Sequence, residues 1–222
     1  MEVSKTSKKG YNLSKAVDED QLIKNLRFLL DLNYDIEKVD YFRPRAFEVD
    51  EDLRGMVFQY MMRGNHVIAL ELSGLGFHDG TRALTTIPEE IFQLTHLEIL
   101  NLADNSIREI PKAILNLKKL KRLDLRENAL STIPEWIDGL TSLEELYLNS
   151  NVLTQLPASI GNLHNLRILS ILSCRLESLP ESLKNLEHLE EFAINSFRSD
   201  RYPDVLKKLQ EQGCDIHEYV IP

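Results

Sequence analysis

Histidine and cysteine are the side chains that most often hold metals or act as nucleophiles, and both are few and scattered in this 222-residue chain. His96 and His188 share one position of a sequence repeat, but four repeats separate them, about 19 Å at a strand spacing of about 4.8 Å. That separation is far beyond metal–ligand distances. Cys214 and His217 lie close together but lack a third ligand. The pattern therefore predicts no metal site.

Patterns for nucleophilic, acid–base and phosphate chemistry are also poor. Cys174 has no histidine or other base at a neighbouring strand position to activate it. The adjacent carboxylates of Glu144 and Glu145 are expected to be solvated, and Gly74-Leu-Gly76 is only a fragment of a phosphate-cradling loop. We therefore expect no catalytic residue and no cofactor, and we interpret the chain as a non-enzymatic protein.

Charge and composition narrow the class of partner. Hydrophobic residues make up 43% of the chain and charged residues 27%, which is sufficient for a folded core. The net charge is −9, and residues 67–222 hold 15 Lys and Arg against 23 Asp and Glu, a net of −8. Such an acidic region repels phosphate backbones, so nucleic acid is not an expected partner, and a basic peptide or protein surface is favoured.

The chain shows neither a membrane span nor a disulfide framework. No stretch approaches 18 consecutive apolar residues, and residues 1–15 are lysine-rich without the apolar run of a signal peptide. The two cysteines are too few for a disulfide framework. These features predict a protein of the reducing cytoplasm that does not insert into membranes.

An internal repeat of 23 residues dominates the sequence. Residues 120–142, LKRLDLRENALSTIPEWIDGLTS, show one unit almost unmodified, and four full units fill 97–188. The phase is marked by prolines and leucines that each recur at steps of 23, namely Pro88, Pro111, Pro134, Pro157 and Pro180, and Leu97, Leu120, Leu143, Leu166 and Leu189.

Each part of the unit has a structural meaning. The alternating L-x-L core predicts a short strand whose leucines face one way. Asn105, Asn128 and Asn151 follow the strands, where a buried amide can satisfy unpaired backbone groups, and Cys174 replaces the amide at the next rung. The Leu-Pro pair predicts a short helical turn. Because one coil cannot bury both faces alone, we expect stacked coils with parallel strands.

These 23-residue units with their LP signature resemble the intracellular leucine-rich repeats of Ras-suppressor, Scribble-type and plant intracellular Ras-group proteins, over roughly residues 67–197. The resemblance implies an α/β leucine-rich-repeat solenoid, with a curved parallel sheet on the concave face and short helical turns on the convex face. It also implies protein binding, with small GTPases, phosphatases and other scaffolds among the family's partners.

The chain divides into four expected segments. Residues 1–17 are a flexible tail, and 18–66 form a helical N-terminal cap, with one helix from Asp18 to about Leu32 and a second from Asp50 that includes Tyr60 and Met61. Residues 67–197 are the repeats, with an insertion at 78–84 in the irregular first repeat. Residues 198–222 close the solenoid with a helix from Pro203 to Gln212 and a strand over 214–220.

The expected partner-binding surface lies on the concave face, where side chains that alternate with the core leucines point outward. We expect charged residues there to surround exposed apolar anchors, of the kind that a partner buries. Alternatively, these anchors contact nothing or are covered by a tail. A separate alternative is that the insertion at 78–84 or the N-terminal helices contribute to partner binding. The predicted site comprises Arg122, Asp124, Arg126, Glu145, Tyr147, Asn149, Ile168 and Leu172.

The leading functional hypothesis is a monomeric protein-interaction module in intracellular signalling. A small GTPase is a candidate partner only because the resemblance to the intracellular leucine-rich-repeat proteins implies it. One alternative is the substrate-recognition arm of a larger enzyme system such as a leucine-rich-repeat ubiquitin ligase. Another alternative is a structural solenoid that self-associates.

Overall fold

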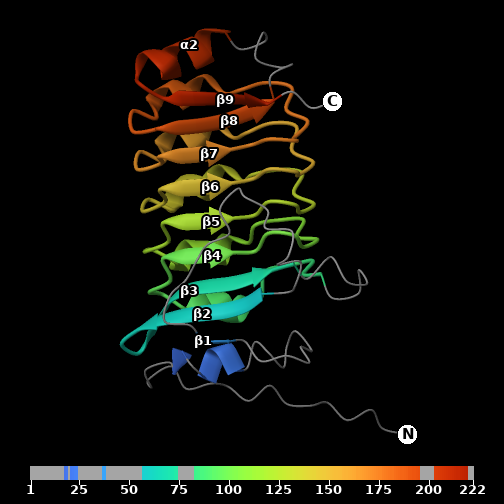
Figure 1. Cartoon of the computed structure of the whole chain (residues 1–222), viewed down its shortest axis with the longest axis vertical. Helices are drawn as coiled ribbons and strands as arrows, with labels where there is room; N and C mark the ends of the chain where they lie inside the picture. The colour runs from blue at the N-terminus through green and yellow to red at the C-terminus, as the bar shows by residue number, and fades with distance from the viewer. Residues whose placement is uncertain are drawn as a thin grey trace, which may run out of the picture.

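The computed structural model describes residues 18–19, 21–24, 37–38, 57–74, 83–195 and 203–219. Within these residues the strands form one nine-stranded sheet whose spatial order is the chain order, β1 to β9. Figure 1 shows the strands stacked one above another, with β9 and α2 at the C-terminal end. Each strand contacts its neighbours in the sequence of coils, so the molecule is a solenoid, as predicted.

Five strands come from the regular repeats, and they pair in parallel at a constant step of 23 residues. Ile99 is level with Arg122, which is level with Glu145 in the next coil. The core residue of each strand, a leucine in β4 to β7 and Phe192 in β8, is buried, and its two neighbours in the strand face the opposite side of the sheet, the concave face. These strands are β4 (Ile99–Asn101), β5 (Arg122–Asp124), β6 (Glu145–Tyr147), β7 (Ile168–Ser170) and β8 (Glu191–Asn195).

The predicted helical turns are confirmed as five-residue 3-10 helices, one in each coil. A proline of the 23-residue series precedes each of them, and a leucine ends it. Each turn buries a central isoleucine or leucine, which fills the core opposite the strand leucines. The turns are η2 (Glu89–Gln93), η3 (Lys112–Asn116), η4 (Glu135–Gly139), η5 (Ala158–Asn162) and η6 (Glu181–Asn185).

The asparagine ladder is also confirmed. Asn128 Nδ2 donates to the carbonyl oxygens of Leu102, Leu125 and Arg126, and its Oδ1 accepts the Ile107 N–H at 2.9 Å. Asn105 and Asn151 make the equivalent bonds in their coils. At the fourth rung the buried Cys174 Sγ donates only one bond, to the Leu148 carbonyl. The ladder therefore satisfies polar backbone groups inside the stack.

The residue directly before each ladder position adopts a left-handed backbone conformation. The first coil uses glycine, Gly74 with φ 79°, at this position, whereas the next four coils use other residues. A left-handed φ at a residue with a Cβ is disfavoured by about 1–2 kcal/mol, so the stacked coils must hold this turn in place. These residues are Asp104, Glu127, Ser150 and Ser173, with φ between 53° and 57°.

The predicted second N-terminal helix is wrong. Residues Val57–Arg63 form strand β2, which pairs antiparallel with β3 (His66–Ser73) across a tight turn at Gly64. Tyr60 is buried and Met62 packs against the core, a spacing of two. The spacing of the apolar residues fits a helix as well as a strand. Pairing with β3 selects the strand, because β2 supplies hydrogen-bond partners for the backbone groups on the outer edge of β3. A short β1 (Glu37–Lys38) pairs in parallel with β2.

The first predicted N-terminal helix is described only in part. Asp18 Oδ1 accepts the Gln21 N–H, and residues 19 and 21–24 are helical, as expected of a turn that begins at Asp18. Leu22 and Ile23 are buried in the same core as the repeats. The rest of that helix, the tail at 1–17 and most of the insertion at 78–84 lie outside the described residues.

The C-terminal helix and strand are confirmed. Helix α2 (Pro203–Glu211) packs against η6, and β9 (Asp215–Tyr219) adds in parallel to β8. Gly213, with φ 94°, makes the turn between them. None of the helices in the described part of the chain is long and apolar enough to cross a membrane.

Candidate functional site

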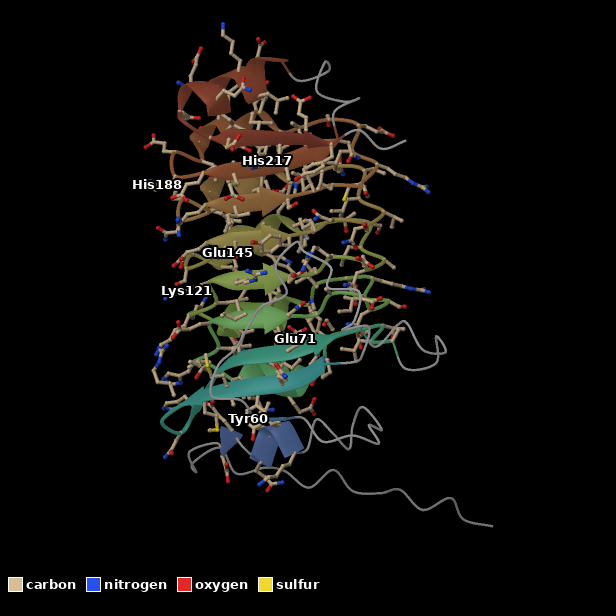
Figure 2. All side chains as sticks on the ribbon, in the orientation of Figure 1. Tyr60, Glu71, Lys121, Glu145, His188 and His217 are labelled. Carbon is tan, nitrogen blue, oxygen red and sulfur yellow. The ribbon has the colours of Figure 1, made fainter. Side chains whose placement is uncertain are left out.

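The eight residues predicted to bind a partner do lie together, on three neighbouring coils. Arg122, Glu145 and Ile168 are level with one another in the sheet, and Asp124 is level with Tyr147. Arg126, Asn149 and Leu172 follow their strands by two residues. Figure 2 shows Glu145 and Glu71 over the strands, whereas Lys121 and His188 lie along one edge of the sheet.

Asp124 is the centre of this surface and is fully buried. Arg126 Nε donates to both carboxylate oxygens, at 2.9 and 3.0 Å, and Arg126 Nη2 lies 2.6 Å from Oδ2. Arg122 Nη2 approaches the same oxygen at 4.0 Å. Burial by itself would lower the pKa of Arg126, but its hydrogen bonds to Asp124 raise that pKa above its usual value. The Arg126 guanidinium is thereby held in one geometry.

Tyr147 lies between the two arginines and Glu145. The guanidinium carbon of Arg122 is 4.6 Å from the ring centroid and that of Arg126 is 5.5 Å away, within range of cation–π attraction. The Tyr147 hydroxyl donates to Glu145 Oε2 at 2.9 Å, and Arg122 Nη1 donates to the same oxygen at 2.8 Å. Desolvation of the ring raises the pKa of Tyr147 above its usual value, so the phenol stays protonated.

The expectation that the apolar anchors Tyr147, Ile168 and Leu172 are exposed on this surface is wrong. Asp124, Tyr147 and Asn149 are buried, and Ile168 and Leu172 are half-buried. At a spacing of about 4.8 Å, side chains in the middle of parallel strands pack against those of the coils on either side, and the arginines lie over Tyr147. Asn149 has a structural role, because its Oδ1 accepts the Leu172 N–H of the next coil at 3.1 Å.

The polar row continues to β3 and β4. Glu71 is level with Asn101, which is level with Asp124. Glu71 Oε2 accepts Asn101 Nδ2 at 2.8 Å and Oε1 accepts the Ser73 N–H at 3.1 Å. Burial raises the pKa of Glu71 to about 7, hydrogen bonds from Ser73 and Asn101 oppose this rise, and the charge of Asp124 adds to it. Glu71 and Asn101 are not among the site residues predicted from the sequence.

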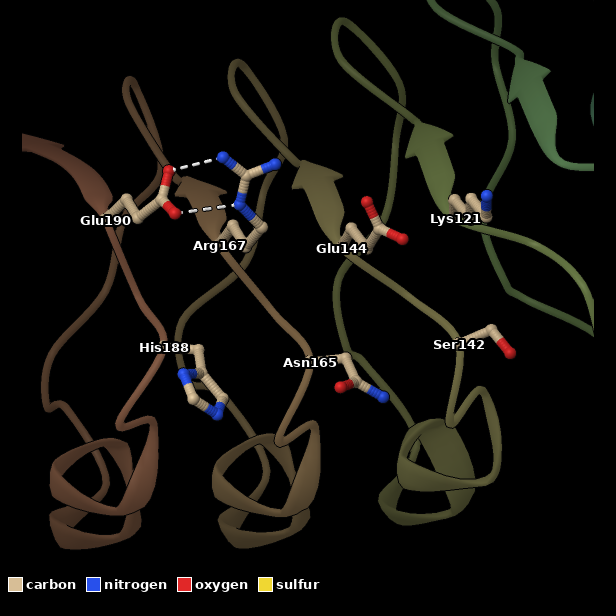
Figure 3. Close-up of a pocket in the computed structure, with 7 residues that line it drawn as sticks. All are labelled: Lys121, Ser142, Glu144, Asn165, Arg167, His188 and Glu190. Atoms are coloured by element: carbon tan, nitrogen blue, oxygen red, sulfur yellow. Dashed lines mark hydrogen bonds and ion pairs between the residues drawn. The ribbon is translucent and has the colours of Figure 1, made fainter.

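A shallow groove of about 480 Å³ runs along the edge of the sheet where the chain enters the strands (Figure 3). Arg167 forms a two-point ion pair with Glu190 there, and both side chains are more than half exposed. Because such an ion pair is solvated and partly satisfied by water, the groove offers little affinity for a small ligand. The lining residues are Lys121, Ser142, Glu144, Asn165, Arg167, His188 and Glu190.

Neither cysteine is prepared for nucleophilic chemistry. Cys174 is buried in the ladder, and desolvation raises the pKa of its thiol. Desolvation and the neighbouring carboxylates Asp215 and Glu191 raise the pKa of Cys214 to about 11. His217 pairs with Asp215 at 3.5 Å. A thiol that stays protonated near neutral pH is a poor nucleophile and a poor metal ligand.

A cluster of two histidines and a carboxylate, which the sequence pattern did not predict, lies at the N-terminal end of the described solenoid. The rings of His66 and His96 stack with centroids 3.6 Å apart, next to the buried carboxylate of Glu19. At the 23-residue step of the regular repeats, His96 shares its position with the distant His188. The first coil has a step of 30 residues, since Ala69 is level with Ile99, and this step aligns His66 with His96.

The sequence comparisons agree with this architecture. A family model described as a leucine-rich repeat matches residues 79–130, 95–153 and 122–176. No curated protein matches the chain.

Three of the solved structures that are similar to this chain are repeat proteins or receptors. A leucine-rich-repeat protein of Leptospira interrogans is 29% identical, covering 60% of this chain and 40% of its own, with a TM-score of 0.49. The plant peptide hormone receptor RGFR1 in complex with RGF2 is 32% identical, with coverages of 58% and 24% and a TM-score of 0.46. A TDR receptor is 22% identical, with coverages of 60% and 24% and a TM-score of 0.48. The chain spans less than half the length of each.

Parallel strands, 3-10 turns and the asparagine ladder recur at the 23-residue step within the region that the family model matches. Folds of this type generally bind other proteins and are typically not enzymes. The repeat region of this chain is therefore a leucine-rich-repeat solenoid.

Proposed function

We propose that this chain is a protein-interaction module that binds a partner protein on its concave face, at the surface formed by β5, β6 and β7. The observation that carries this proposal is the combination of Ile168 and Leu172, both half-buried, with charged side chains already held in place next to them. Arg122 and Arg126 are oriented by Asp124 and Tyr147 before any partner arrives. Preorganised arginines lose little side-chain entropy on binding.

The chemistry of this surface favours a protein over a small molecule. Arginine and tyrosine are enriched at the energetic centres of protein interfaces, where apolar neighbours exclude water. The arginines are already paired with Asp124 and Glu145, so they supply direction more than net charge. The excess of negative charge over residues 67–222 favours a partner with basic residues at the periphery of its contact surface.

The partner class to test first is the small GTPases, which the resemblance to the intracellular leucine-rich-repeat proteins implies. We also propose that the chain acts as a monomer in the cytoplasm. Its two cysteines are free and buried, which suits a reducing compartment. Sedimentation equilibrium of the purified chain tests the monomer, and it also tests the alternative of a self-associating solenoid.

The test is capture by the full 222-residue chain with matched variants. The double variant Ile168→Asp with Leu172→Asp places charge on the proposed contact surface. The control Val152→Asp makes the same kind of change at an exposed side chain beyond the strand, 44% exposed. Purified small GTPases, loaded with GDP or a non-hydrolysable GTP analogue, are assayed directly, and other partners are identified by mass spectrometry from native cells.

A partner on the concave face should bind the wild type and Val152→Asp equally, and bind the double variant at least about tenfold more weakly. Circular dichroism and the thermal midpoint of each variant verify that the fold is retained, and the milder Ile168→Ser replaces the double variant if that variant unfolds. Unchanged capture by the folded double variant would place the contact elsewhere. Selective loss in Val152→Asp would do the same.

A further inference from the structure

We propose that Glu19, His66 and His96 form a binding site for a divalent transition-metal ion, with Zn²⁺ as the best match. One candidate donor atom from each residue lies within 4.8 Å of the other two. Two imidazoles and one carboxylate are a donor set that suits Zn²⁺ and its neighbours in the first transition series. The site lies at the N-terminal end of the solenoid and is independent of the proposed partner surface.

The separations between the donor atoms are near those of a coordinated ion. His66 Nδ1 is 3.1 Å and His96 Nδ1 is 3.9 Å from the same oxygen, Glu19 Oε1. Tetrahedral ligands about 2.1 Å from zinc are about 3.4 Å from each other, so the two distances bracket the required value. The histidine side chains are 48% and 34% exposed, which leaves them room to turn by the remaining fraction of an ångström and leaves a fourth position for water.

Hydrogen bonding already orients the carboxylate. Glu19 is 5% exposed, and its Oε2 accepts the Val67 N–H at 2.5 Å, which directs Oε1 toward the two histidines. Such outer contacts fix the orientation of ligands at metal sites in general. The backbone that holds them is also set, because His66 begins β3 and Val67 is buried beneath it.

The polar atoms of this cluster are incompletely satisfied by one another. His96 Nδ1 is buried and makes no hydrogen bond within the described part of the chain. A buried carboxylate requires a compensating cation or a full set of donors, and the ion-pair partners of Glu19 among the described residues are these two histidines. A divalent ion bound to all three would satisfy Glu19 Oε1 and His96 Nδ1 at once.

The three ligands come from three separate segments of the chain. Glu19 lies in the helical turn that begins at Asp18, His66 begins β3, and His96 lies between η2 and β4. The ion would therefore tie the N-terminal turn to the first two coils of the solenoid. Metal binding that joins distant segments stabilises the folded state, because the site does not exist in the unfolded chain.

The test is metal binding to the full chain after removal of metals with a chelator. Zn²⁺ is titrated calorimetrically, and Co²⁺ serves as a spectroscopic probe because tetrahedral coordination gives it intense visible bands. The variants are His66→Ala, His96→Ala and Glu19→Gln. The matched control is His188→Ala, since His188 holds the same repeat position at the far end of the solenoid. Circular dichroism verifies the fold of each variant.

We expect the wild type and His188→Ala to bind one Zn²⁺ per chain and to gain in thermal midpoint. The three ligand variants should bind at least about tenfold more weakly and gain nothing. Zn²⁺ should also slow trypsin cleavage after the exposed Lys24 in the wild type and leave it unchanged in His66→Ala. If Glu19→Gln fails to fold, the histidine variants decide. No binding by the wild type, or undiminished binding by His66→Ala and His96→Ala, overturns the site.

Discussion

The guanidinium of Arg122 lies over the ring of Tyr147, with Cζ 4.6 Å from the ring centroid, and the two side chains also meet at one atom, Oε2 of Glu145. Arg122 is on β5 and the other two residues are on β6, so the contact joins neighbouring coils on the concave face. A cation, a π face and a carboxylate therefore fix one another at the centre of the proposed partner surface.

This contact should appear as coupling between the two residues. Arg122→Met and Tyr147→Leu keep apolar bulk but remove the charge and the ring. In a double-mutant cycle of urea unfolding, we expect a favourable coupling of about 1 kcal/mol between Arg122 and Tyr147, because the pair is mostly shielded from water. Additive effects of the two substitutions would mean that the stacking contributes nothing to stability.

The rungs of the ladder should differ in their contribution to stability. Asn151→Ala removes the acceptor of the Leu130 N–H and the donor to the carbonyls of Leu125 and Leu148, so we expect a loss of about 3 kcal/mol in the free energy of unfolding. Cys174→Ala removes one weak bond and should cost about 1 kcal/mol. Chemical denaturation of both variants checks the order. Equal losses would contradict the hydrogen-bond account.

The convex side predicts a contrast between two glycines of successive 3-10 turns. A Cβ at Gly161 would lie 2.2 Å from the backbone oxygen of Ser182, whereas one at Gly139 would meet only the end of the Leu115 side chain, at 2.8 Å. Gly161→Ala must therefore push two coils apart, and we expect it to destabilise the chain by about 2 kcal/mol.

In Gly139→Ala the leucine can turn away, and the variant should be close to neutral because alanine also restricts the unfolded chain. Thermal midpoints of the two alanine variants, measured under one condition, test the contrast. A Gly161→Ala midpoint at or above that of Gly139→Ala would show that η5 and η6 are less tightly packed than described.

The buried Glu71 predicts a pH dependence of stability. Its folded-state pKa of about 7 lies above the ordinary value of 4.5, so the folded chain binds this proton more tightly than the unfolded chain does. The contribution of Glu71 is complete below about pH 4.5 and is lost as pH rises through 7, a fall on the order of 3 kcal/mol. Asp124 faces the same row and strengthens the effect.

Glu71→Gln should remove this fall. The measurement is the free energy of unfolding in urea at steps from pH 4.5 to 8, for the wild type and the variant. The wild-type free energy of unfolding minus that of Glu71→Gln isolates Glu71 from the other carboxyl groups. This difference should fall steadily as pH rises. A difference that does not change with pH would mean that Glu71 titrates near its ordinary value.

The repeating part of the fold could be predicted from residue spacing. Proline and leucine at a constant step of 23 imply identical coils, and identical coils can bury their apolar faces only by stacking. The asparagine ladder followed from the same periodicity, because an amide at each strand end can bond backbone groups of two coils. The terminal helix and strand at 203–219 were visible because Gly213 separates two different periods of hydrophobic residues.

The non-repeating part could not be predicted in the same way. The apolar residues of 57–63 fit a helix as well as a strand, and only the free edge of β3 selects the strand, since its backbone groups need partners. The first coil steps by 30 residues, and a period of 23 does not reveal this step. It therefore took the three-dimensional register to bring His66 onto His96 and Glu71 next to Asn101.

Local spacing thus determined the coil, its strand, its turn and its ladder, because those depend on residues a few positions apart and on one constant period. Tertiary structure alone decided which side chains of the concave face remain accessible. Alternation correctly placed Tyr147 on that face, but Tyr147 is buried, because the neighbouring coil brings Arg122 and Arg126 against its ring. Such burial depends on contacts between side chains of neighbouring coils, 21 and 25 positions apart in the chain, which the pattern of one strand does not contain.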